Sequence, residues 1–165
     1  TDGRWQYSRE TLSLSNNANY AWIQHFIYHL NPKGAAGFVL AKGSLTSKTN
    51  GEDKIRKALI EAGLVDCIVN LPTKLFLNTQ IPACLWFLSR AKESDPNHPR
   101  RDKILFIDAR NMGKLINRRT RELTDEDIST IADTYHNWKT SEGYEDVPGF
   151  CKSALVLEVA ALDYV

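Results

Sequence analysis

The chain has 165 residues, which corresponds to about one domain with room for a hydrophobic core. Its 42% hydrophobic and 25% charged residues are typical of a soluble globular chain, and no apolar run approaches the ~18 residues of a membrane span. The formal net charge of +1 provides no overall field that would indicate nucleic acid or a membrane surface as a partner.

The first 17 residues are polar and irregular, and they include two large aromatic side chains, Trp5 and Tyr7. A disordered tail is usually poorer in aromatic residues. We therefore expect residues 1–17 to be an irregular lead-in, which either belongs to the middle of a longer protein or crosses a surface as an ordered loop.

A helix is predicted over residues 18–30, with Asn16 or Asn17 as its N-terminal cap. His25 and His29 lie four residues apart on it, as metal ligands can, but no third ligand stands nearby. We expect solvated or capping histidines and no metal site. The apolar spacing of the helix predicts a buried stripe of Ile23, Phe26, Ile27 and Leu30.

Strands are predicted at residues 37–42, 65–70 and 83–88, and a second helix at residues 51–62. Helices that alternate with buried strands favour a parallel sheet with helices on both faces. Only a loop separates the last two strands, so these two must form an antiparallel hairpin. The prediction is an α/β fold with a mixed sheet.

The loop between those two strands, residues 71–82, contains the apolar pair Leu75 and Phe76. Loops are normally polar, because their backbone must meet water. These two side chains must therefore either be buried in the core or be exposed to bind a partner.

The last third of the chain follows a charged, proline-bearing connection. It reads as a strand at residues 104–109, a basic loop at 110–122, a helix that begins after Thr124, and a short strand and helix within 151–165. Asp127 stands in the N3 position of a capping box. The predicted buried stripe of this helix consists of Ile128, Ile131, Ala132 and Tyr135.

Three cysteines, Cys67, Cys84 and Cys151, make an odd number and form no CxxC pair. Two of them fall inside predicted strands. We expect reduced thiols in the core of a cytoplasmic protein.

Several segments in order carry a resemblance to a known family. The chain resembles the methylation subunit of type I restriction–modification systems, an N6-adenine DNA methyltransferase. The resemblance covers nearly the whole chain and rests on residues 4–7 (RWQY), 19–25 (NYAWIQH), 51–56 (GEDKIR), 71–76 (LPTKLF), 79–82 (TQIP) and 105–109 (LFIDA).

The resemblance implies the C-terminal half of a Rossmann-like class I methyltransferase fold within a single domain, 1–165. The methyltransferase half-sheet would occupy residues 18–90, and a family-specific extension would occupy 91–165. The strand at 83–88 would lie between the other two strands. The strand at 37–42 would lack a neighbour on one side, so we expect self-association through this edge, or shielding by residues 1–17.

The resemblance also implies methyl transfer from S-adenosylmethionine to adenine N6 in DNA, with a DNA-specificity subunit and a restriction subunit as partners. The family's glycine-rich cofactor motif and its catalytic Asn-Pro-Pro-Phe are absent from the 165 residues. We therefore expect no catalytic or cofactor-binding residue here, and no activity of the isolated chain. The alternative is a non-catalytic α/β interaction domain derived from a methyltransferase. An in-frame cofactor motif upstream would decide between the two.

Phe76 stands where adenine methyltransferases carry an aromatic platform for the target base, which must leave the duplex stack before it reacts. The alternative for Phe76 is a plug of the core beneath the loop. Other candidate DNA contacts are Lys74, Thr79 and Gln80 in this loop and Arg118, Arg119 and Arg121 in the basic loop. For the basic loop we favour the alternative that its charges are solvated and balance the acidic start of the next helix.

Overall fold

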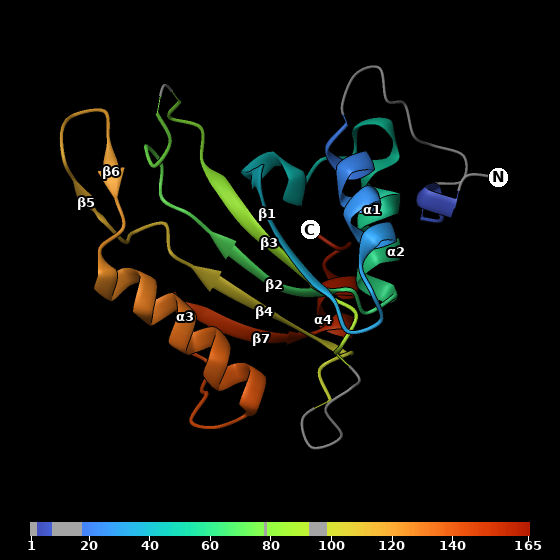
Figure 1. Cartoon of the computed structure of the whole chain (residues 1–165). Helices are drawn as coiled ribbons and strands as arrows, with labels where there is room; N and C mark the ends of the chain where they lie inside the picture. The colour runs from blue at the N-terminus through green and yellow to red at the C-terminus, as the bar shows by residue number, and fades with distance from the viewer. Residues whose placement is uncertain (1–2, 8–17, 78, 93–98) are drawn as a thin grey trace.

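The structure, a computed structural model, describes residues 3–7, 18–77, 79–92 and 99–165 (Figure 1). Its centre is a mixed sheet of five strands in the order β1-β3-β2-β4-β7. The strands are β1 Ala35–Ala41, β2 Val65–Asn70, β3 Ala83–Ser89, β4 Lys103–Asp108 and β7 Cys151–Leu155.

The position of β3 agrees with the expectation from the sequence. It lies between β1 and β2 and runs antiparallel to both, with Phe38 opposite Trp86 and Ile68 opposite Trp86 on the other side. Strand β4 is parallel to β2, and β7 is antiparallel to β4. Strands β1, β2 and β4 therefore share one direction, and their carboxyl ends meet at one edge of the sheet.

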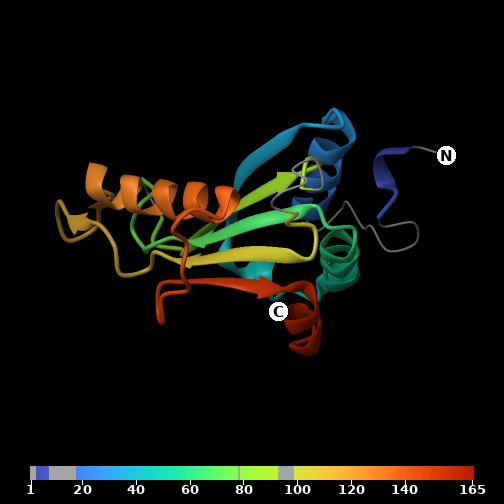
Figure 2. The same cartoon turned by 90° about the horizontal axis from the view of Figure 1, so that it is seen from below.

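Helices α1 (Asn19–His29) and α2 (Glu52–Glu61) cover one face of the sheet. Gly63 ends the second helix in the left-handed conformation, with a φ of 69°, where a glycine is strongly favoured. Trp86 and Ile68 from the sheet pack here against Ile23 and Ile55. Figure 2 shows the same layers from below.

The predicted stripe of α1 is partly wrong. Phe26 is 38% exposed and stacks on Phe38 at the sheet edge, whereas Tyr20 and Gln24 are buried. The reason is hydrogen bonding: the Tyr20 hydroxyl donates to the Ser44 carbonyl oxygen at 2.6 Å, and Gln24 Oε1 accepts the N–H of Tyr7 at 3.1 Å. A polar side chain with such a partner can be buried at little cost. The predicted caps Asn16 and Asn17 lie outside the described residues.

Helix α3 (Asp125–Thr140) covers the other face. Its capping box is confirmed: Thr124 Oγ1 accepts the Asp127 N–H at 3.1 Å, and the Asp127 carboxylate accepts the Thr124 N–H at 2.8 Å. The predicted buried stripe is partly right: Ile131 and Tyr135 are partly buried and pack against the core of this face, whereas Ile128 is 52% exposed. Trp138, outside the predicted stripe, is the buried residue of this helix.

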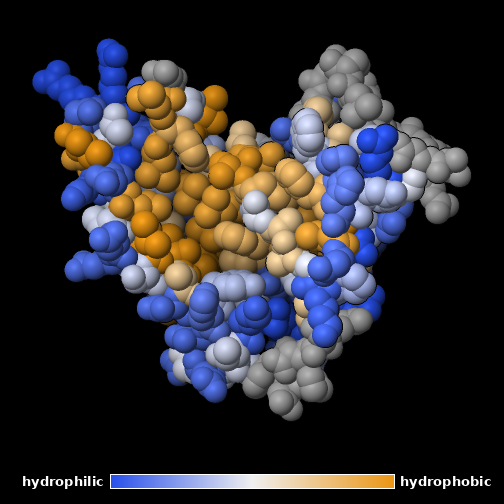
Figure 3. Space-filling view, in the orientation of Figure 1, coloured by the Kyte–Doolittle hydropathy of each residue, from blue (hydrophilic) through white to orange (hydrophobic). Residues whose placement is uncertain are grey.

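Helix α3 stands away from the sheet and leaves an apolar groove with a volume of about 470 Å³ between them. Figure 3 shows this groove as a hydrophobic hollow in the middle of the molecule. The stripe residues of α3 line the groove, and of these Tyr135 also reaches the sheet, where its ring stacks on Phe87 of β3. The groove is lined by residues that include Gly37, Leu85, Phe87, Ile128, Ile131 and Tyr135.

The predicted basic loop contains a small hairpin of β5 (Lys114–Leu115) and β6 (Arg121–Glu122). Helix α4 (Val156–Ala161) follows β7, as the sequence predicted. None of the helices in the described part of the chain is long and apolar enough to cross a membrane. Short 3₁₀ helices occur at Gly3–Trp5, Lys42–Leu45 and Thr49–Gly51.

Candidate nucleic-acid interface

The carboxyl edge of the sheet collects most of the predicted site residues. The loop 71–82 leaves this edge after β2, and the β5–β6 hairpin follows β4 at the same edge (Figure 1). Ligands of open α/β sheets bind outside the carboxyl ends of the strands. The structure thus brings together two segments that lie some 40 residues apart in the sequence.

The two apolar residues of loop 71–82 differ in burial. Leu75 packs against the core on the α3 side of the sheet. Phe76 is 39% exposed, and its neighbour Leu77 is 83% exposed. Leu75 therefore anchors the loop, and Phe76 presents part of its ring at the surface.

Lys74 joins this loop to the hairpin through two hydrogen bonds. Its Nζ donates to the Arg118 carbonyl oxygen at 3.0 Å, and its own carbonyl oxygen accepts the Arg121 N–H at 2.8 Å. Its φ of 68° lies in the left-handed region, which a lysine rarely adopts. A residue keeps such a backbone conformation where its surroundings fix it.

The other two candidates in the loop differ in their contacts. Thr79 Oγ1 accepts the N–H of Ile81 at 3.2 Å, so this side chain closes a local turn. Gln80 is exposed. The structure thus gives Thr79 a role within the loop and leaves Gln80 available at the surface.

The arginines of the hairpin differ in whether their guanidinium groups have partners. The Arg121 guanidinium donates to the carbonyl oxygens of Met112 and Gly113 at 2.9 and 2.8 Å, so it stabilises the hairpin. Arg118 and Arg119 are exposed at the tip, and within the described residues neither guanidinium has a hydrogen bond or ion pair. These two arginines are therefore free to meet a ligand.

Arg110 precedes the hairpin and is engaged with Asp108 at the end of β4. Its Nε donates to Asp108 Oδ1 at 2.7 Å. This hydrogen bond is the main reason why the pKa of the Asp108 carboxyl lies below its usual value. Sequence reasoning grouped Arg110 with the other basic residues, whereas the structure gives it a local partner.

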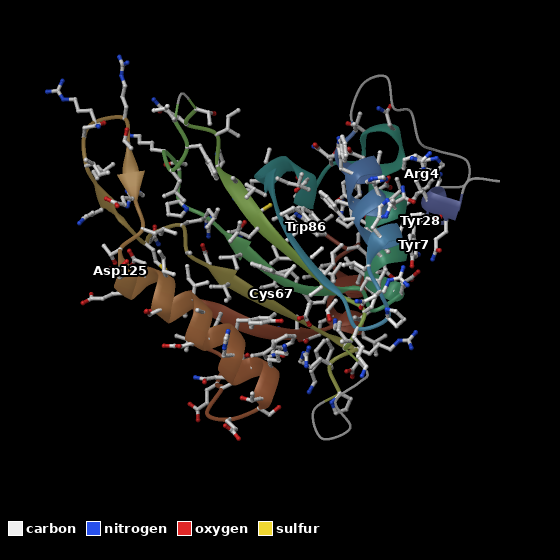
Figure 4. All side chains as sticks on the ribbon, in the orientation of Figure 1. Arg4, Tyr7, Tyr28, Cys67, Trp86 and Asp125 are labelled. Carbon is white, nitrogen blue, oxygen red and sulfur yellow. The ribbon has the colours of Figure 1, made fainter. Side chains whose placement is uncertain are left out.

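The acidic start of α3 lies near the hairpin, but among the described residues it forms no ion pair with the arginines at the tip. Figure 4 shows Asp125 at the end of α3 that lies nearest the hairpin. The Asp127 carboxylate accepts hydrogen bonds from Thr124 and from the Gly113 N–H at 3.1 Å. Through the described segments, no ion pair joins Arg118 or Arg119 to this helix start. Direct ion pairing therefore does not hold these two arginines, and the charge-balance interpretation of the basic loop stays a prediction.

A buried polar network on the α3 side was not expected from the sequence. Asp66 is 1% exposed, and its carboxylate accepts the Tyr135 hydroxyl at 2.7 Å and faces Arg100 Nε at 3.5 Å. Burial, with Asp66 adding to it, raises the pKa of Tyr135. The network fastens α3 to β2. Its only sequence signal is a single Asp inside an apolar strand.

The apolar groove does not fit S-adenosylmethionine, the cofactor that the family resemblance implies. That molecule carries an ammonium, a carboxylate and ribose hydroxyls, which need convergent polar groups. The described lining is mostly aliphatic and aromatic, and its one carboxylate, Asp66, is already bonded to Tyr135 and Arg100. We therefore derive no catalytic step from this groove.

A second cavity of about 440 Å³ lies where β2 and β4 end, beside residues 146–152. Asn70 Oδ1 is buried there without a hydrogen-bond partner, and Asp146 is occupied by the Tyr144 hydroxyl and the Ser153 N–H. One unpaired amide oxygen does not define a ligand. We therefore assign no binding site to this cavity.

Histidines and cysteines show no metal geometry in the part of the chain that the structure describes. The rings of His25 and His29 pack edge to face with centroids 4.5 Å apart, and no group of three metal-ligating side chains occurs within that part. Cys67, Cys84 and Cys151 are buried free thiols. Burial raises the pKa values of Cys67 and Cys84, which disfavours their reactive thiolate forms.

Comparison with known proteins supports the family resemblance. Residues 1–165 match the model of the N-6 DNA Methylase family. The methylase subunit of the type I restriction enzyme HindI from Haemophilus influenzae is 51% identical over 164 residues, which cover 99% of this chain and 35% of that protein. The MjaIX methylase subunit from Methanocaldococcus jannaschii is 45% identical over 92% of this chain and 26% of its own length.

A solved structure agrees with this relationship. The methyltransferase subunit of a type I restriction–modification system from Streptococcus thermophilus superposes with a TM-score of 0.83 at 30% identity. The match covers 99% of this chain and 31% of that one, so the chain spans about a third of the relatives that it matches. The expected class I methyltransferase half-fold is confirmed, and the chain belongs to the N-6 DNA methylase family.

Proposed function

We propose that this chain is the substrate-facing part of a type I modification subunit that transfers a methyl group from S-adenosylmethionine to adenine N6 in DNA. Its relatives are named as methylase subunits of type I restriction enzymes. The partners we propose are DNA, a DNA-specificity subunit and a restriction subunit. Bacterial and archaeal relatives make the cytoplasm the proposed location.

The half-exposed ring of Phe76 at the carboxyl edge of the sheet is the observation that carries this proposal. A flipped adenine needs a flat apolar surface to replace the stacking that it loses. Base–aromatic stacking contributes ~1–3 kcal/mol, and such stacking needs an exposed ring face. Leu75, the neighbouring residue, anchors the loop in the core, so the exposed ring of Phe76 is held on an anchored segment.

The cofactor and the catalytic Asn-Pro-Pro-Phe are proposed to come from other segments of the longer protein. The 165 residues contain neither this motif nor a glycine-rich cofactor motif. The chain by itself is therefore proposed to bind no S-adenosylmethionine and to methylate no adenine. Its contribution is to hold the target base and the adjacent DNA.

One experiment tests these roles by comparing the complete modification enzyme with the 165-residue chain. In the complete enzyme, Phe76→Ala should weaken capture of the target base about ten- to a hundredfold, which corresponds to the loss of one stacked base. Capture is measured from the fluorescence of 2-aminopurine at the target position. Calorimetric titration should give unchanged cofactor affinity for the variant and no saturable binding for the 165-residue chain.

Leu77→Ala is the matched control, because Leu77 is an exposed apolar neighbour that lacks a stacking face. It should leave base capture nearly unchanged. If Phe76→Ala unfolds early and loses cofactor binding as well, Phe76 is a core plug. If the complete enzyme shows no methylation at all, the interaction-domain alternative gains support.

A further inference from the structure

We propose that the β5–β6 hairpin, residues 114–122, binds the phosphates beside the target base and holds the Phe76 loop in place through Lys74. This inference rests on the proposed function, because it takes DNA as the partner. It adds to that function a second contact surface and a positioning residue.

The hairpin forms a defined structure. The Ile116 N–H donates to the Thr120 carbonyl oxygen at 2.9 Å, and the Asn117 side chain accepts the Arg119 N–H at 2.8 Å. The Arg121 guanidinium fixes its base through Met112 and Gly113. The backbone at the tip is thus held by internal hydrogen bonds, which leaves the two arginine side chains for external contacts.

The hairpin tip that carries the free charges contacts the segment just before the exposed Phe76. Arg118 and Arg119 are exposed and without ion pairs in the described part of the molecule. Lys74 contacts the Arg118 carbonyl oxygen and stands two residues before Phe76. A base turned out of the duplex remains attached to its two flanking phosphates, so a ligand of Phe76 brings anionic groups to this place. Guanidinium groups suit phosphate geometry better than other side chains do.

Lys74 is the positioning residue of this arrangement. Its carbonyl oxygen and its ammonium group bond to the two sides of the hairpin, at Arg121 and Arg118. The bonds hold its backbone in the left-handed conformation, and this conformation sets the direction in which the chain continues to Phe76. The direction of the chain towards Phe76 therefore depends on the position of the hairpin.

The first test measures DNA affinity of the complete modification enzyme over a range of salt concentrations. Arg118→Gln combined with Arg119→Gln should reduce the slope of log affinity against log salt by ~2, because each phosphate contact contributes about 0.9. Lys33→Gln combined with Lys139→Gln is the charge-matched control, since both lysines are exposed and lie away from the carboxyl edge. The control should keep the wild-type slope.

The second test concerns Lys74 and uses 2-aminopurine fluorescence at the target position. Lys74→Met should lower base capture severalfold and reduce the salt slope by less than the double arginine variant does. Lys74→Arg keeps a donor for the Arg118 carbonyl oxygen and should restore base capture. Thermal unfolding of each variant shows whether the fold is intact.

The outcomes separate this inference from the proposed function. A wild-type salt slope in the double arginine variant would overturn the phosphate contact, even if Phe76→Ala still abolished base capture. Equal base capture by wild type and Lys74→Met would overturn the positioning role. If Phe76→Ala had no effect on base capture, the proposed function itself would fail, whatever the hairpin variants show.

Discussion

Lys92 shows how a charged residue can be buried in this fold. It is 2% exposed, and its Nζ donates to the carbonyl oxygens of Val65 and Lys103, both at 2.6 Å. Burial lowers the pKa of Lys92 to about 8, while Asp66 and Asp102 oppose the shift and Arg100 adds to it. These carbonyl oxygens satisfy the amine in both protonation states, because a neutral amine still has two N–H donors.

The stability of the chain should therefore depend on the charge of Lys92. Between a folded pKa of about 8 and the ordinary value of 10.5, the unfolded state binds more protons, so the free energy of unfolding rises with pH in this window. Relative to Lys92→Met, the wild type should gain on the order of 1–3 kcal/mol across it. Urea unfolding at several pH values measures this gain. Lys54→Met, at an exposed position, should follow the wild type. If the free energy of unfolding changed with pH in the same way for the wild type and Lys92→Met, the lowered pKa of Lys92 would be contradicted.

The sequence gives no sign of this burial. Lys92 stands in a charged, proline-bearing connection, which the composition predicts to be solvated. Its two acceptors belong to β2 and β4, and they meet only because these strands pair in parallel. Side chains that bond to backbone oxygens of distant strands leave no local pattern, and this is why residue-level reasoning missed Lys92.

At the scale of elements, α3 shows which features the sequence predicts and which it does not. The capping box is local, so Thr124 and Asp127 identified the start of the helix correctly. The burial of its stripe depends on what lies opposite, and opposite Ile128 there is a groove. Periodicity identified the side of the helix that faces the sheet, and it could not give the distance between the two. The same limit applies to α1, where hydrogen bonds buried Gln24 in place of Phe26.

The attachment of α3 to the sheet depends on Tyr135. Tyr135→Phe should lower the free energy of unfolding by ~1–3 kcal/mol, because the buried Asp66 carboxylate loses a donor at 2.7 Å. Denaturant unfolding of the 165-residue chain measures this loss. Tyr28→Phe is the control: Tyr28 is 54% exposed, so the change should stay within ~0.5 kcal/mol. If both variants lost the same free energy of unfolding, the hydrogen bond from Tyr135 to Asp66 would contribute no measurable stability.

At the scale of the whole molecule, β1 is an edge strand. It pairs with β3 on one side, and no other described segment pairs with it. Val39 is 48% exposed on this strand, and Trp22 and Phe26 of α1 are 58% and 38% exposed. These side chains give the edge an apolar, solvent-exposed surface. Residues 3–7 lie by α1, and residues 8–17 are outside the described part, so shielding of the edge by the lead-in stays a prediction.

We predict that the 165-residue chain self-associates through β1, because an unpaired apolar edge is a template for another strand. Light scattering should show dimers or larger species, and hydrogen exchange should show protected amides in residues 35–41. Val39→Lys introduces a charge on the edge and should shift the chain towards the monomer. A monomeric wild type whose β1 amides exchange freely would show that the edge tolerates exposure to water.

The central place of β3 in the sheet has a consequence for synthesis on the ribosome. Strand β1 ends at Ala41, yet its partner β3 begins only at Ala83. Since β1 and β2 do not pair with each other in this sheet, neither can make its contact with β3 until β3 has been translated. Within this part of the protein, more than 40 residues must be made after β1, and 12 after β2, before either strand can pair with β3.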